Sequence, residues 1–192
     1  MPRGTYVHLG DGLEERFQCA PGPGGWRYVG QRSDGVRVDL VVDARWRQIR
    51  VEVVAPHWWI RGGVTGHELA WVRGAGTDAP TEHGARAVAF AGESPGFLVA
   101  VARTLGLSEG ERADVRLVRL NGTALSALTV TERWRLADVT AHETDSGPLP
   151  VERYEIADLA TAEAVAVHVA GDVVLDAPGI ELADLESPPT LA

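Results

Sequence analysis

The sequence contains no lysine, and its 18 basic residues are all arginine. They are outnumbered by 27 aspartate and glutamate residues, which leaves a net charge of −9. Because a nucleic-acid backbone is bound by a positively charged surface, this balance argues against a nucleic-acid partner. The arginines are also scattered between carboxylates along the chain, so the sequence predicts no local basic patch.

Cysteine and long apolar runs are scarce as well. Cys19 is the one thiol, so the chain can form neither an internal disulfide nor a thiolate metal cluster, and a small buried or semi-exposed thiol is its simplest interpretation. No apolar run reaches the roughly 18 residues that a membrane span needs. The N-terminal residues lack the apolar core of a signal peptide. The sequence therefore predicts no stable membrane insertion and a cytoplasmic location.

Motifs for the common kinds of catalytic chemistry are missing too. The histidines fall in separate segments, and none forms the paired spacing of a metal site. The glycine-rich stretch 22–25 lacks the lysine and the helix of a phosphate-binding loop, and no GxSxG sequence marks a nucleophile. We therefore expect no metal and no cofactor, while the absence of motifs leaves open whether the protein is an enzyme.

The strongest positive signal is alternation of apolar and polar residues with a period of two, which is typical of strands with one buried face. It runs through residues 36–53, with a turn at Ala44-Arg45, and again through 128–136 and 164–169. Glycine and proline separate these runs every eight to twelve residues or so. The pattern predicts a mainly β protein with a curved antiparallel sheet.

Residues 94–107 depart from this pattern and predict one central α-helix. Ser94 can cap it, Pro95 suits its first turn, and Gly106 can end it. The helix divides a single domain, 1–186, into halves at about 1–90 and 110–186. Each half holds an apolar hairpin, which suggests a weak tandem repeat. Residues 187–192 are predicted to be a disordered tail.

Tryptophan is the conspicuous aromatic residue, with six copies against three each of phenylalanine and tyrosine. Its broad apolar face and single donor suit both sheet cores and ligand pockets. Trp58 and Trp59 are adjacent, so on a strand they face opposite ways and cannot both enter one core. One of them must meet a second environment, such as a pocket, a lid or a partner; packing of each under a loop is the alternative.

Polar residues that interrupt apolar faces are the candidates for chemistry. Glu132 shares a face with Val130 and Trp134, where an unpaired carboxylate would be costly. It is either paired with an arginine or poised in a cavity as a proton donor. Asp43 and His67 are the other candidate catalytic residues, and with Arg45 they are candidate polar anchors at the rim of a pocket.

Several short segments, in order, resemble a bacterial family described as glycolipid-binding proteins. Gly12-Leu13-Glu14 matches the family's GLE, and 36–53 is similar to its YxLxTDxxWxTRxLxV hairpin. The stretch SPGFLVAVARTLGL at 94–107 fits TPFTNTLPIRRLGL without gaps. Further similar segments are 130–136, 153–155 and 176–180.

This resemblance implies a spiral β-roll, a tandem half-barrel whose curved sheet encloses a hydrophobic cavity. One departure matters: the polar TPFTNT of the family is here Ser94-Pro95-Gly96-Phe97-Leu98-Val99. If this segment lines the cavity, the cavity is more apolar than the family's, and a polyketide or terpenoid chain suits it better than a sugar headgroup.

The function expected from the sequence is binding of a large hydrophobic, lipid- or polyketide-like molecule inside the roll. The alternative is a cofactor-free cyclase or isomerase of secondary metabolism, which holds a folded polyketide or terpenoid near its reacting geometry. A protein-interaction scaffold built on the tryptophan cluster is a third interpretation. The sequence leaves the oligomeric state open. The residues expected at the ligand are Trp46, His57, Trp58, Trp59, Trp71, Phe97, Trp134 and Tyr154.

Overall fold

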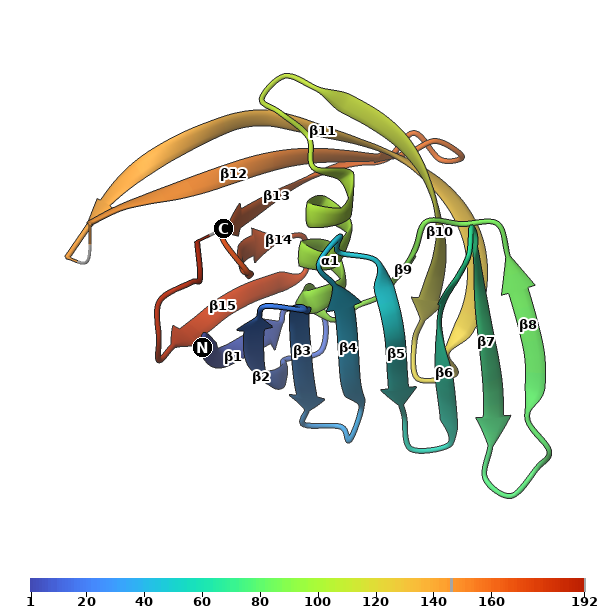
Figure 1. Cartoon of the computed structure of the whole chain (residues 1–192). Coiled ribbons are helices and arrows are strands. Elements are labelled where there is room, and N and C mark those ends of the chain that lie inside the picture. Colours follow the sequence, from blue (N-terminus) through green and yellow to red (C-terminus); the bar gives the residue numbers. More distant parts are fainter. Residues whose placement is uncertain (146, 192) are drawn as a thin grey trace.

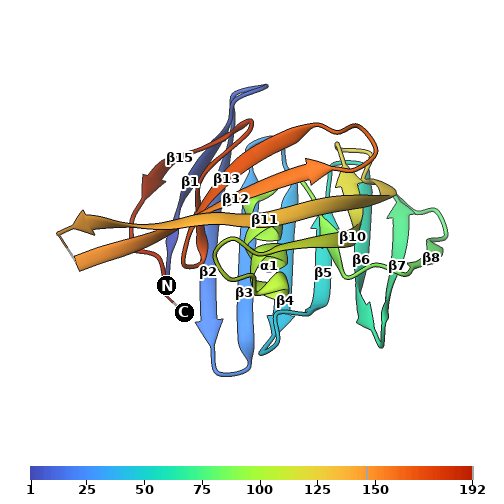
Figure 2. The same ribbon diagram turned by 90° about the horizontal axis from the view of Figure 1, so that it is seen from above.

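The computed structural model describes residues 1–145 and 147–191, which form one 15-stranded curved sheet and one helix. The sheet curls around the helix and stays open rather than closing into a barrel (Figures 1 and 2). The mainly β fold predicted from the alternating pattern is therefore confirmed.

The elements follow the chain as one long meander interrupted by α1. The strands of the N-terminal half are β1 (Arg3–His8), β2 (Leu13–Gly22), β3 (Gly25–Arg32), β4 (Arg37–Asp43), β5 (Gln48–Val54), β6 (Trp58–Thr65), β7 (Glu68–Ala75), β8 (Thr81–Ala85) and β9 (Ala89–Ala91). After α1 (Pro95–Leu105) come β10 (Arg112–Asn121), β11 (Ser126–Thr144), β12 (Gly147–Asp158), β13 (Ala164–Ala170), β14 (Val173–Ala177) and β15 (Ile180–Leu185).

The order in the sheet is β8-β7-β6-β5-β4-β3-β2-β1-β15-β14-β13-β12-β11-β10-β9. The first and last strands therefore meet in its middle, where β1 pairs with β15. The described strand pairs are antiparallel except β9 and β10, which are parallel because α1 lies between them in the chain. This arrangement leaves β8 and β9 as the two edges.

The predicted hairpin at 36–53 is β4 and β5, with Leu40 opposite Val51. Both side chains are fully buried, whereas Arg50 between the buried positions is exposed. The period-two pattern of the sequence thus places one face of this hairpin in the core, except at Ile49, where a register shift beside Val42 leaves Ile49 exposed and Gln48 buried. The strand predicted at 128–136 is correct in position but continues to Thr144 as part of β11.

The predicted helix is confirmed as α1, which lies inside the roll (Figure 2). Gly106 ends it in a left-handed conformation, as the sequence indicates, with its N–H donating to the carbonyl of Ala102. Ser94 precedes it in an extended conformation, but its hydroxyl makes no cap bond and donates instead to Glu15 Oε1 at 2.5 Å. Gly96 lets α1 approach β3, because a Cβ there would lie 2.5 Å from the Tyr28 ring.

Of the tail predicted at 187–192, residues 187–191 are described and form neither helix nor strand, and residue 192 lies outside the described residues. The backbone N–H of Thr190 donates to Asp172 Oδ1 at 2.7 Å. In the described part of the chain, α1 is too short to span a bilayer, and no other helix occurs there.

Candidate functional site

A pocket of about 330 Å³ lies between α1 and the C-terminal half of the sheet. We call it the helix pocket. Its apolar walls come from α1, from the inner faces of β11 to β13 and from the β14–β15 turn. The lining residues are Ala91, Gly92, Glu93, Phe97, Leu98, Val101, Arg119, Leu120, Asn121, Glu132, Trp134, Ile156, Asp158, Glu163, Val165, Val167, Ala177, Pro178 and Ile180.

Strand alternation and helix periodicity bring these side chains together. On β11, Glu132, Trp134 and Leu136 are buried, whereas the arginines between them are exposed. On α1, Phe97, Leu98 and Val101 recur at helical spacing and share the side that faces β11. Helix and strand therefore present their apolar stripes to each other without meeting completely, and the space between them is the pocket.

A hydrogen-bonded polar group occupies one wall of the helix pocket. Glu132, which is 6% exposed, accepts a hydrogen bond from Arg119 Nη2 at 2.7 Å and one from Trp134 Nε1 at 2.8 Å. Arg119 Nη2 also donates to Asp158 Oδ2 at 3.2 Å. The two situations considered for Glu132 thus occur together: it pairs with an arginine and it lines a cavity.

Tyr154 lies behind this wall rather than in it. Its ring meets that of Trp134 edge to face, with centroids 5.8 Å apart, and its hydroxyl donates to Glu152 at 3.2 Å. Burial and the carboxylate of Glu152 raise the pKa of Tyr154 to about 12. Glu152 also accepts from Arg103 of α1 at 2.8 Å, so this group attaches the helix to β12.

Trp46 and Asp43 belong to a second pocket of about 290 Å³, which Arg103 borders near the C-terminal end of α1. Trp46 adopts a left-handed conformation with φ of 62° in the β4–β5 turn. Its ring packs on that of Trp26, with centroids 5.5 Å apart. Asp43 accepts hydrogen bonds from the backbone and side chain of Arg47 and from the backbone of Arg45. The carboxylate of Asp43 therefore stabilises the β4–β5 turn.

Trp58 and Trp59 face opposite sides of β6, as their adjacency predicts. Trp58 packs against the core with the guanidinium of Arg73 3.5 Å from its ring centroid. Trp59 lies over Gly74, where a Cβ would come within 2.5 Å of the indole, and Arg61 stacks on it at 5.4 Å. Among the described residues that line the helix pocket, neither is present.

The remaining predicted residues lie elsewhere in the N-terminal half. Trp71 is buried against Phe90, and its ring stacks on that of His83 with centroids 5.5 Å apart. His57 is exposed between β5 and β6, and His67 is exposed in the β6–β7 turn, where it lines a further pocket of about 340 Å³ together with Arg86. The predicted set is thus divided: Glu132, Phe97 and Trp134 share the helix pocket, and the others do not line it.

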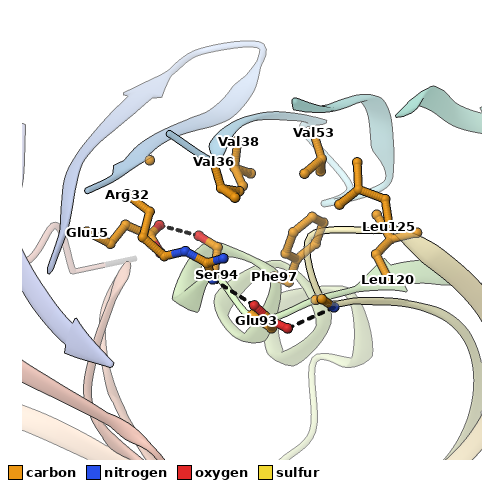
Figure 3. Close-up of a pocket in the computed structure, with 13 residues that line it drawn as sticks. Glu15, Arg32, Val36, Val38, Val53, Glu93, Ser94, Phe97, Leu120 and Leu125 are labelled. Atoms are coloured by element: carbon orange, nitrogen blue, oxygen red, sulfur yellow. Dashed lines mark hydrogen bonds and ion pairs between the residues drawn. The ribbon is translucent and has the colours of Figure 1, made fainter. Parts of the chain in front are cut away.

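A smaller cavity of about 30 Å³ adjoins the helix pocket at Phe97 and Glu93. Figure 3 shows Phe97 between the valines of the N-terminal half and Leu120 and Leu125. Glu93 closes this side by pairing with Arg32 Nη1 at 2.7 Å and accepting from the N–H of Gly122 at 2.9 Å (Figure 3). This volume is large enough for a water molecule but too small for an organic ligand.

Glu15 at the back of this small cavity is satisfied by the protein itself. It accepts hydrogen bonds from the hydroxyls of Tyr28 and Ser94 on Oε1, and Oε2 lies 3.0 Å from His8 Nε2. Glu15 and Glu132 are both buried. Of these two buried glutamates, only Glu132 borders a space that could admit a ligand.

Arg119 and Asp158 are among the site residues that the sequence interpretation missed. The sequence did contain a signal for Arg119. Along a strand, Arg119 lies on the same face as Val115 and Leu117, so it interrupts an apolar face, as Glu132 does. Opposite charges on the buried faces of two neighbouring strands predict a pair. Asp158 ends β12, where alternation gives no such signal.

Comparison with known proteins supports the fold. The structure is similar to that of a DUF1089 family protein from Pseudomonas aeruginosa, with a TM-score of 0.51 and 17% sequence identity over 87% of this chain and 84% of that one. At this identity the likeness concerns the fold alone. No family model matches the sequence, and no curated protein matches it either.

Proposed function

We propose that the protein binds a hydrophobic small molecule in the helix pocket, with the polar end of the ligand at Glu132, Arg119 and Asp158. The observation that carries this proposal is a pocket with mostly apolar walls, in which Arg119 joins Glu132 and Asp158 in a hydrogen-bonded polar cluster. Ligand pockets commonly have this composition, with a few polar groups that orient a ligand held by apolar contact. The likeness to glycolipid-binding proteins in short motifs points in the same direction.

The volume of the pocket limits the size of the ligand that can bind. Its volume of about 330 Å³ lies at the lower end of the range for small-molecule sites, which favours a compact molecule over a long lipid. Phe97 and Leu98, which stand where the glycolipid-binding motif is polar, are both in the wall. The body of the ligand is therefore apolar, and burial of its surface at about 25 cal/mol per Å² drives binding.

Titration with N-phenyl-1-naphthylamine, a neutral dye that fluoresces in apolar surroundings, tests this proposal. We expect saturable binding to the wild type and a loss of at least about tenfold in affinity in Leu98→Trp, which fills the pocket from α1. The matched control is Leu128→Trp, since Leu128 is exposed on β11 and lies outside the lining. Equal affinity of the three proteins for the dye would refute the proposal.

A cyclase or isomerase acting on a hydrophobic polyketide or terpenoid is the second candidate. It is favoured by the carboxylates of Glu132 and Asp158 beside the Trp134 indole, because such groups stabilise positive charge that develops on a folded polyene. Native mass spectrometry after mild purification would identify a retained molecule. If fresh protein converts that molecule into a product of equal mass and different chromatographic retention, the protein is an enzyme; an unchanged molecule indicates a binding protein.

A further inference from the structure

The charges in the helix pocket are predominantly negative. Four carboxylates line it, those of Glu93, Glu132, Asp158 and Glu163, against the single guanidinium of Arg119. Glu93 is offset by Arg32, whose Nη1 lies 2.7 Å from it just outside the lining. Among the described residues in and beside the pocket, two negative charges therefore remain without a matching arginine.

Arg119 is already engaged with the carboxylates of the protein. Its Nη2 donates to both Glu132 and Asp158. A carboxylate on a ligand would have to share this guanidinium with two others and would approach Glu163 as well. In a pocket with apolar walls such repulsion is weakly screened, because the local dielectric is lower than that of water.

A cationic ligand is attracted to these carboxylates, whereas an anionic ligand is repelled. Asp158 and Glu163 are at the more exposed side of the polar wall, whereas Glu132 is deep within it. An ammonium group there gains attraction from the carboxylates of Asp158 and Glu163. The net negative charge of the pocket thus distinguishes among hydrophobic ligands that would bind equally well to its apolar walls alone.

We propose that the helix pocket selects hydrophobic amines over hydrophobic acids, the protonated nitrogen binding at Asp158 and Glu163. This proposal rests on the proposed function, because it assigns a ligand class to the same pocket. Fatty acids are then poor ligands despite the apolar walls. A compact apolar molecule with one basic nitrogen is the ligand class that fits both the volume and the charge.

Displacement of N-phenyl-1-naphthylamine by n-octylamine, n-octanol and n-octanoate at neutral pH tests it. The three probes share a chain and differ in charge, so apolar burial is nearly constant among them. We expect octylamine to bind at least about tenfold more tightly than octanoate, with octanol between them. Glu163→Gln and Asp158→Asn should each reduce the preference for the amine. Glu82→Gln is the control, because it removes an exposed carboxylate of β8 outside the lining.

The outcomes separate the two proposals. Equal affinity for the three probes, tightest binding of octanoate, or an equal effect of Glu82→Gln would overturn the selection of amines and leave ligand binding intact. If the dye does not bind the wild type, or binds Leu98→Trp equally well, ligand binding in the helix pocket itself is refuted.

Discussion

The side-chain amide of Gln48 pairs with both backbone groups of Phe90. Its Nε2 donates to the carbonyl of Phe90 at 2.9 Å, and the N–H of Phe90 donates to its Oε1 at 2.7 Å. Gln48 belongs to β5 and Phe90 to β9, an edge strand that lies far away in the order of the sheet. One fully buried side chain therefore provides the bonds that a neighbouring strand would provide and fastens the curled sheet onto itself.

Gln48→Leu should destabilise the protein substantially. The substitution leaves the buried N–H and carbonyl of Phe90 without partners, at about 1–3 kcal/mol for each group. We expect urea unfolding to show a loss of about 2–5 kcal/mol in the free energy of unfolding. Gln31→Leu, at an exposed position of β3, is the control and should change stability by less than about 0.5 kcal/mol. Similar losses in both variants would show that the Gln48–Phe90 pairing is not needed.

Arg119→Met should also destabilise the protein, because Glu132 is buried and loses its cationic partner. Arg119 is about one-third exposed, so we expect about 1–3 kcal/mol, less than a fully buried pair would give. Glu132→Gln in the same chain removes the unpaired charge, and the double variant should be more stable than the sum of the two single losses predicts. Strict additivity in urea unfolding would mean that the pair does not interact energetically.

The Cys19 thiol should be inert in the folded protein. Burial, together with the nearby carboxylate of Asp172, raises its pKa, so the neutral thiol is favoured. Its contribution to stability is fully present below the ordinary thiol pKa of about 8.5 and is lost as the pH rises from there towards the raised value. Ellman's reagent should react with Cys19 only after unfolding.

The variant Cys19→Ala is the control for the pH dependence of stability. Between about pH 7.5 and 9.5, the wild type should lose stability more steeply than Cys19→Ala, because only the wild type exposes an ionising thiol on unfolding. Parallel curves, or a thiol that reacts rapidly in the native state, would contradict the burial of Cys19 described here.

Much of the fold can be predicted from the sequence because alternation has a direct physical meaning. Val38, Leu40 and Val42 could bury one face only as a strand, and Gly106 could end a helix without strain. The curling of the sheet could not be predicted in this way. It depends on pairings such as β1 with β15 and Gln48 with Phe90, which join residues that no local pattern relates.

The candidate site could be predicted in part for the same reason. Glu132 and Trp134 carry a visible signal, a polar residue and a large aromatic on one strand face, and both line the helix pocket. The density of aromatics at Trp58 and Trp59 was misleading as a guide to this pocket. Their environments are completed by Arg73, Gly74 and Arg61, and the sequence pattern does not show which partners a cross-strand pair will have.

The indole N–H resonances of the six tryptophans, followed by ¹⁵N-edited NMR during titration with n-octylamine, test the central claim most directly. Trp134 lines the helix pocket and donates its indole N–H to Glu132, so its signal should shift with ligand concentration. The signals of Trp58, Trp59 and Trp71 should stay in place. Shifts at Trp58 or Trp59 with an unchanged Trp134 signal would contradict the assignment of the ligand to this pocket.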